Sequence, residues 1–248
     1  MDSVLILKTD ISTTTVDEVS ELLQIKNSST VAICNANSLV RSYKNPALQK
    51  KLNSFNVRTP DGFPVAKASN ILYRNNQKRV DGYNVFLQTI EKGLEKNLTH
   101  YFFGSNEIIV TKLINELKNK YPEIKILGYA CPPYSNYEKL ATETYLRDAN
   151  KKKPDVIWVS LGFPKQEEFI DLVSKEKIVD SNLVGIGGVF EWVAGTKIKA
   201  PEFVANLGLE WILRLIQEPK RLYKRYFIDN LLFVFYFSRQ ALRKKDTN

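Results

Sequence analysis

The fold is indicated by residues 155–186, which read DVIWVSLGFPKQEEFIDLVSKEKIVDSNLVGI. This stretch begins with an apolar run at 155–161, continues with an amphipathic segment at 165–175 and ends with a second apolar run at 182–186. Short apolar runs that alternate with helical patterns are typical of parallel strands joined by crossover helices. The stretch therefore predicts a strand, a helix and a second strand of a mostly parallel sheet.

The same alternation extends toward the N-terminus. Runs rich in apolar and β-branched residues predict further strands at 30–34, 55–57, 100–103 and 124–127. Amphipathic segments predict helices at 37–52, 83–94, 105–120 and 137–150. A strand at 4–8 and a helix near 16–25 are expected to form an edge unit. We therefore predict an α/β fold with a mostly parallel sheet and helices on both of its faces.

The C-terminal part of the chain has a different character. After Pro201 the sequence predicts consecutive helices at 208–217, 219–227 and 230–245, with no strand between them. We place a boundary near Lys199, which divides the chain into an α/β core at 1–199 and a helical appendage at 200–248.

Positive charge and apolar residues are both concentrated in this appendage. The chain has 36 basic and 27 acidic residues, and between 211 and 245 nine basic residues stand against two acidic ones. Such a segment points to a polyanionic partner: nucleic acid, an anionic membrane surface or a phosphorylated substrate. One predicted helical face groups Phe227, Leu231, Val234 and Phe235, which favours a helix lying on an anionic bilayer. An ordinary docking or dimer helix is the alternative.

The sequence lacks the usual patterns of secretion, membrane insertion and metal binding. Its longest candidate for a spanning helix, at 226–237, contains Asp229 and Asn230 and is shorter than the roughly 18 to 20 residues that such a helix needs. The start of the chain does not read as a secretory signal, so a cytoplasmic location is expected. Cys34 and Cys131 form no C-x-x-C pair, which excludes a cysteine zinc module and suits a reducing cytosol. Without a D-x-D pair or a P-loop pattern, neither a carboxylate-held metal nor a P-loop nucleotidase is predicted.

The loops that follow the predicted strands contain the candidate site, because ligands of open parallel sheets bind beyond the carboxyl ends of the strands. The polar and glycine residues in these loops include Asn35, Asp61, Gln166, Gly187 and Gly188. Glycines let backbone N–H groups approach a phosphate, and the Gln166 amide can hydrogen-bond a sugar or a phosphate. Asp61 can act as a general base, although an aspartate before a glycine is most often a turn residue. Arg79 is near enough in sequence to pair with an acid of this rim.

Several segments in register resemble one enzyme family. Residues 184–201, VGIGGVFEWVAGTKIKAP, and residues 208–221, GLEWILRLIQEPKR, resemble the signature of the WecG/TagA/CpsF glycosyltransferases, glycosyltransferase family 26. Residues 61–64, 101–104, 132–134 and 154–167 fall in the order and spacing of that family. The resemblance covers nearly the whole chain.

The resemblance implies a Rossmann-like core whose C-terminal appendage completes the active site and meets the inner face of the cell membrane. It implies an inverting transfer of an N-acetylmannosamine-type sugar from a UDP donor to a polyprenyl-diphosphate-linked GlcNAc acceptor. The product would serve the synthesis of teichoic acid, common antigen or capsule. No cofactor is expected, because the UDP-sugar is itself a substrate, and no metal is expected.

Carried over by position, the resemblance gives most candidate residues a role. Asp61 is implied to be the base that acts on the acceptor hydroxyl. The residues implied to bind the donor are Asn35, Gln166 and the nearby Arg79 at the sugar, Tyr134 and Glu191 near the nucleotide, and Arg214, Arg221 and Arg225 at the diphosphate. Arginines can stabilise a departing diphosphate in place of a metal.

Two other classes of function stay open at this point. Ile33 stands where the family often has threonine, and Pro132-Pro133 replaces a turn that more often contains glycine. These differences leave the donor sugar open and permit a non-catalytic nucleotide-binding or membrane-scaffold protein with the same fold. A nucleic-acid-binding appendage is the other alternative, and the apolar face within 227–237 argues against it. The sequence does not decide between a monomer and a homo-oligomer.

Overall fold

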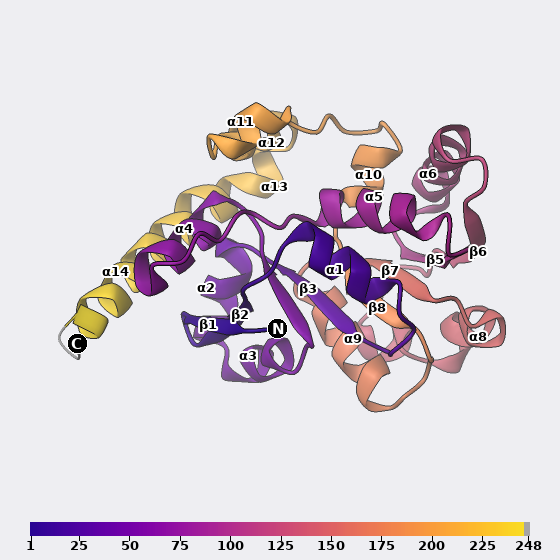
Figure 1. Ribbon diagram of the computed structural model, residues 1–248, viewed down its shortest axis with the longest axis horizontal. Coiled ribbons are helices and arrows are strands. Elements are labelled where there is room, and N and C mark those ends of the chain that lie inside the picture. The colour runs from indigo at the N-terminus through magenta and orange to yellow at the C-terminus, as the bar shows by residue number, and fades with distance from the viewer. Residues whose placement is uncertain (246–248) are drawn as a thin grey trace.

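A six-stranded parallel sheet forms the centre of the protein. The computed structural model describes residues 1–245, apart from the side chains of Glu143, Asn206, Arg221, Lys224, Arg225, Tyr226 and Lys245. The strands lie in the order β4-β3-β8-β7-β5-β6 (Figure 1). They are β3 (Thr30–Cys34), β4 (Val57–Pro60), β5 (Thr99–Gly104), β6 (Lys125–Ala130), β7 (Val156–Ser160) and β8 (Asn182–Gly185). All neighbouring strands in this sheet are parallel, which confirms the predicted α/β fold.

The stretch at 155–186 folds as predicted. Strands β7 and β8 pair in parallel, and helix α9 (Lys165–Lys175) connects them. Within β7, Ile157 and Val159 belong to one buried apolar cluster, whereas Val156 and Trp158 belong to the other. Because successive side chains point to opposite faces and both faces are covered, this strand is apolar throughout.

Helices cover both faces of the sheet (Figure 1). The first cluster includes side chains of α2 (Ala36–Lys44), α3 (Pro46–Asn53), α8 (Glu143–Lys152) and α9. The second cluster includes side chains of α1 (Val16–Leu23), α5 (Gly82–Gly93), α6 (Glu107–Lys120) and α10 (Val189–Val193). Aromatic pairs join sheet and helices on each side, with Phe103 stacked on Phe169 at 4.6 Å and Phe86 edge-on to Trp158 at 4.8 Å between ring centroids. Burial of such large side chains dominates the stability of a core.

Several local predictions were wrong or incomplete. The helix expected at 37–52 is two helices, because Pro46 has no N–H to continue α2 and the Asn45 side chain instead caps α3. The helix expected at 137–150 is likewise split into α7 (Tyr137–Leu140) and α8. The N-terminal edge unit contains an antiparallel hairpin of β1 (Ser3–Ile6) and β2 (Thr9–Ser12), which forms a sheet of its own. Helix α4 (Phe63–Tyr73), which follows β4, was not predicted.

The C-terminal part is helical, as its sequence pattern indicated. It comprises α11 (Glu202–Asn206), α12 (Glu210–Gln217), α13 (Pro219–Lys224), the π-helical turn η1 (Arg225–Asp229) and α14 (Asn230–Lys245). Helix α14 packs on α2 and α4, and its Phe233 is buried in the first apolar cluster (Figure 1). Farther along α14, the Gln240 side chain accepts a hydrogen bond from the Leu7 N–H and donates one to the Leu5 carbonyl. Among residues 1–245, no helix is both long enough and apolar enough to cross a membrane.

A close backbone contact between β5 and β7 gives a test of the sheet. Gly104 has a φ of +103°, and a Cβ at this position would lie 2.5 Å from the Ser160 carbonyl oxygen. We expect Gly104→Ala to lower the free energy of unfolding by about 2–4 kcal/mol, from backbone strain and steric overlap together. Gly162→Ala is the matched control, because Gly162 also has a positive φ, +75°, but no atom within 4 Å of an added Cβ. Urea unfolding of both variants should show the larger loss for Gly104→Ala, and equal losses would contradict the overlap.

Candidate active site

Two adjoining cavities open beyond the carboxyl ends of the strands. The strand-end cavity is lined by the segments that follow β3, β7 and β8, including Gln166, Gly187 and Gly188. The interhelical cavity lies between α4, α12 and α14, and its apolar lining includes Phe63, Pro64, Trp211, Phe233 and Val234. Both cavities are lined by Asn35, Asn37, Asp61, Glu210 and Arg214. These five residues form the junction at which the two cavities meet.

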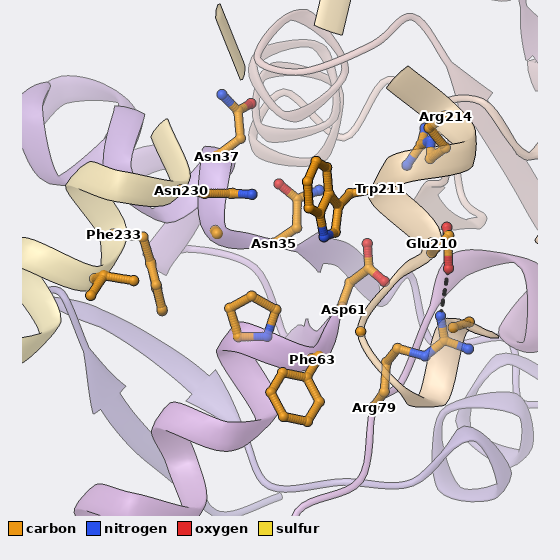
Figure 2. A pocket seen from close by; sticks show the side chains of 16 residues that line it. Asn35, Asn37, Asp61, Phe63, Arg79, Glu210, Trp211, Arg214, Asn230 and Phe233 are labelled. Carbon is orange, nitrogen blue, oxygen red and sulfur yellow. Dashed lines mark hydrogen bonds and ion pairs between the residues drawn. The ribbon is translucent and has the colours of Figure 1, made fainter. Parts of the chain in front are cut away.

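Asp61 stands at this junction, as its predicted place at a strand end indicated. It follows β4 directly, and its backbone N–H donates to the Cys34 carbonyl of the neighbouring strand at 2.8 Å. Gly62, with a φ of +80°, then turns the chain into α4. In Figure 2 the Asp61 carboxylate lies beside Trp211, Glu210 and Arg79.

The surroundings of Asp61 make it a stronger base than an ordinary carboxylate. Burial raises the pKa of Asp61 to about 7, and the carboxylates of Glu210 and Asp81 act in the same direction. The guanidinium groups of Arg79 and Arg214 oppose this rise. A carboxylate whose pKa lies near neutral pH is well matched to general base catalysis.

Arg79 pairs with two carboxylates, one of which comes from the appendage. Its Nη1 lies 2.7 Å from Glu210 Oε2, and its Nη2 lies 3.4 Å from Asp81 Oδ2. Asp81 also caps α5, where its side chain accepts a hydrogen bond from the Asn84 N–H. Arg79 therefore connects the segment before α5 to the start of α12.

Two asparagines at the start of α2 line the junction (Figure 2). Asn35 caps α2 by accepting a hydrogen bond from the Ser38 N–H at 3.2 Å. The Asn37 amide donates to the Asp229 carboxylate of η1. Asn35 is thus held at the predicted position, and Asn37 joins α2 to the C-terminal part of the chain.

Gln166 lies at the strand-end cavity and is almost fully buried. Its Nε2 donates to Glu167 Oε1 at 2.9 Å, and its Oε1 accepts the Gly187 N–H at 3.1 Å. The Gly187 carbonyl in turn accepts from the Ser160 hydroxyl at 2.6 Å. Burial raises the pKa of Glu167 to about 8. The two predicted residues Gln166 and Gly187 are therefore brought together, and Gln166 holds the glycine loop in place.

Arg214, which was predicted to bind the diphosphate, lies at the junction of the two cavities. Its guanidinium is 4.8 Å from the centroid of the Trp192 ring, and the side chain lines both cavities next to Gly188. Arg221 and Arg225, which were given the same role, have side chains outside the described part of the structure.

Two predicted residues are not brought to the cavities. Tyr134 is 96% exposed, and its ring faces the Lys165 ammonium at 3.4 Å from the centroid. Glu191 does not line either cavity and pairs with Lys197 at 2.7 Å. Lys197 also pairs with Glu218 at 2.9 Å, so this network connects the core to the end of α12. The role of both residues at the nucleotide stays a prediction.

Sequence reasoning missed the residues that the appendage places at the interhelical cavity. Glu210 and Trp211 both belong to the quoted stretch 208–221, but without tertiary contacts their partners could not be inferred. Phe63 was quoted only as part of the segment 61–64. Within the described residues, no group of three or more histidine, cysteine, aspartate or glutamate side chains is arranged to hold a metal ion.

Comparisons with known proteins identify relatives over most of the chain. The sequence profile of the glycosyl transferase WecG/TagA/CpsF family matches residues 4–247. A Bacillus spizizenii protein named N-acetylglucosaminyldiphosphoundecaprenol N-acetyl-beta-D-mannosaminyltransferase is 31% identical over 178 residues, which make up 72% of this chain and 67% of that protein. A Bacillus subtilis protein of the same name is 32% identical over 170 residues, 68% of this chain and 64% of the relative. A Staphylococcus aureus protein of that name is 25% identical over 245 residues, 96% and 94% of the two chains.

Proposed function

Since this chain belongs to the WecG/TagA/CpsF family of glycosyl transferases, we propose that it transfers an N-acetylmannosamine-type sugar from a UDP donor to a polyprenyl-diphosphate-linked GlcNAc. The names of the three relatives describe a transferase that acts on N-acetylglucosaminyldiphosphoundecaprenol, which supports this class of acceptor. The product would enter the synthesis of a bacterial surface polysaccharide.

The observation that carries the proposal is the meeting of two cavities at Asp61. The donor would occupy the strand-end cavity, where the loop at Gly187 and Gly188 allows close approach of a phosphate to the backbone. The acceptor would occupy the interhelical cavity, whose lining of Phe63, Trp211 and other apolar side chains suits a lipid-linked sugar. The reacting atoms of the two substrates would then meet at the junction.

The chemistry would be a single displacement at the anomeric carbon. Asp61 would take the proton of the acceptor hydroxyl while that oxygen forms the new bond to the donor sugar. The bond between the sugar and UDP breaks with its electron pair on the diphosphate, and the configuration at the anomeric carbon inverts. Arg214 would stabilise the charge that develops on the leaving diphosphate, without a metal ion or cofactor.

The exposed side chains of the C-terminal helices support contact with the inner face of the membrane. Leu231, Val234 and Phe235 on α14 are all more than half exposed, and Val234 also lines the interhelical cavity. Basic residues follow on the same helix, a combination that favours binding to an anionic bilayer. An acceptor anchored in the membrane could therefore reach the cavity from the side of α14.

A donor panel tests the proposal directly. UDP release is measured for several UDP-N-acetylhexosamines, with a soluble polyprenyl-diphosphate-GlcNAc analogue as acceptor and EDTA present. We expect acceptor-dependent release with one donor and no loss of rate in EDTA. The control acceptor lacks the GlcNAc and should give no release. If UDP binds but no donor of the panel is turned over, the N-acetylhexosamine donor is refuted, and a donor of another sugar class or a non-catalytic nucleotide-binding role takes its place.

A further inference from the structure

Glu210 occupies an unexpected place in the active site. It is the first residue of α12 and comes from the appendage, and in Figure 2 its carboxylate faces the Arg79 guanidinium, with Asp61 to one side of this pair. Its carboxylate forms the shorter of the two ion pairs of Arg79, at 2.7 Å against 3.4 Å for Asp81. Among the described residues, no ion pair joins Arg79 to Asp61, although both line the interhelical cavity.

Within the part of the chain that the structure describes, the ion pairs of Arg79 do not include Asp61, although both side chains line the same cavity. The Arg79 side chain is only 10% exposed, so its guanidinium depends on nearby carboxylates for compensation of its charge. Asp61 is one possible partner, but Glu210 and Asp81 already occupy two nitrogens of the guanidinium. A base that formed its own salt bridge to arginine would bind a proton more weakly.

We infer that Glu210 is a positioning residue that engages Arg79 and so leaves the Asp61 carboxylate without a salt bridge, free to accept the proton of the acceptor hydroxyl. The inference rests on the proposed role of Asp61 as base. It gives the appendage a second task, because the group that keeps the base reactive is supplied by α12.

The charges around Asp61 determine the direction of the expected effect. The groups that face it are Glu210 and Arg214 on α12, Arg79 and Asp81 before α5, and the Cys34 thiol at the end of β3. Removing the Glu210 charge takes away one carboxylate and releases the Arg79 guanidinium toward Asp61. Both changes favour the ionised form of Asp61, and its pKa should fall from about 7.

The pH dependence of kcat/KM measures this shift, since its acid limb reports the base of the free enzyme. For the unmodified protein we expect activity to fall as the pH drops through about 7. In Glu210→Gln the midpoint should move to lower pH by about one unit, and the plateau at high pH should fall by about 3- to 10-fold because the base is weaker. The two profiles should therefore approach each other or cross on the acid side.

Glu218→Gln is the matched control. Glu218 caps the C-terminal end of the same helix and pairs with Lys197, but it does not face Asp61. The substitution therefore removes one carboxylate from the appendage and weakens the attachment of the appendage to the core. Its midpoint should stay at that of the unmodified protein. Equal midpoints for Glu210→Gln and the unmodified protein would overturn the inference, as would equal shifts in both variants.

Two further variants keep the outcome decisive. Glu210→Asp retains the charge, but its shorter side chain reaches less far toward Arg79. The midpoint of its pH profile should therefore fall between those of the unmodified protein and Glu210→Gln. If Glu210→Gln does not fold, an unchanged midpoint in Glu210→Asp overturns the inference. Full activity in Asp61→Asn would remove the proposed base itself, whereas an inactive Asp61→Asn with an unshifted Glu210→Gln would remove only the role of Glu210.

Discussion

Asp61→Asn is expected to reduce turnover by about 10²- to 10⁴-fold, the usual contribution of a general base. The amide has nearly the shape of the carboxylate but cannot take up the proton of the acceptor. Among the described residues, no hydrogen bond or ion pair of the Asp61 side chain would be lost. Steady-state UDP release measures the loss, and calorimetry should show UDP affinity within about 2-fold of the unmodified protein.

Asp171→Asn is the matched control for this substitution. Asp171 is also a buried aspartate, but it lies on α9 and accepts hydrogen bonds from Ser54 and Lys175, away from both cavities. The Asp171→Asn variant should keep most of its transferase activity even if it is less stable than the unmodified protein. Unchanged turnover in Asp61→Asn would exclude Asp61 as the base.

Asp61→Asn has a second expected property, which follows from the raised pKa of Asp61 in the unmodified protein. In the folded protein the carboxyl ionises near pH 7, whereas in the unfolded chain it ionises near pH 4. Ionised Asp61 therefore disfavours the folded state, and stability is lost as the pH rises through this window. Asp61→Asn should be more stable than the unmodified protein at pH 8, by about 1–3 kcal/mol once partial solvent access is allowed for. Urea unfolding at pH 5 and pH 8 should show the advantage growing with pH.

A chain that ends at Lys199 is expected to have no measurable transferase activity. It lacks Glu210, Trp211, Arg214 and Phe233, which form one wall of the interhelical cavity, whereas Gln166 and the glycine loop remain. UDP release with the acceptor analogue measures the loss. A fully active truncated chain would contradict the assignment of the acceptor to this cavity.

The truncated chain should keep its parallel sheet but lose stability. Phe233 is 3% exposed and packs in the first apolar cluster, so its removal uncovers part of α2 and α4. Burying one such aromatic side chain is worth about 1.5–3 kcal/mol. Circular dichroism should report a folded α/β protein whose urea midpoint is lower than that of the full chain, and the loss of all helical signal would refute an independently folding core.

The sequence predicted the parts of the fold that depend on local pattern. β3, α9 and α14 begin and end where their apolar periodicity indicated. The errors arose where one residue outweighs a pattern, as at Pro46, which divides an otherwise continuous helical stretch. Helix α4 was missed because its start is set by Gly62 and Pro64 at a turn that resembles a loop.

The residues of the candidate site that follow the strands could be predicted from the sequence. Asn35, Asp61 and Gln166 follow strands of one parallel sheet, and this topology alone places them at one edge. Glu210 comes from a helix 131 positions away from its partner Arg79. Its role depends on how the appendage folds back over the sheet, and no local pattern encodes that contact.

The contact of Gln240 with Leu5 has a consequence for biosynthesis. These residues are 235 positions apart, so the β1-β2 hairpin gains its hydrogen bonds to α14 only after nearly all of that helix has left the ribosome. Domains generally fold from the N-terminus as they are synthesised, and here that order cannot be completed. The sheet and the contacts of the hairpin with β4, α3 and α4 can form during translation, but the hydrogen bonds of Leu5 and Leu7 with Gln240 form only once α14 is present. In the cell, exposure of this edge of the hairpin to chaperones and proteases should therefore depend on how quickly α14 is synthesised.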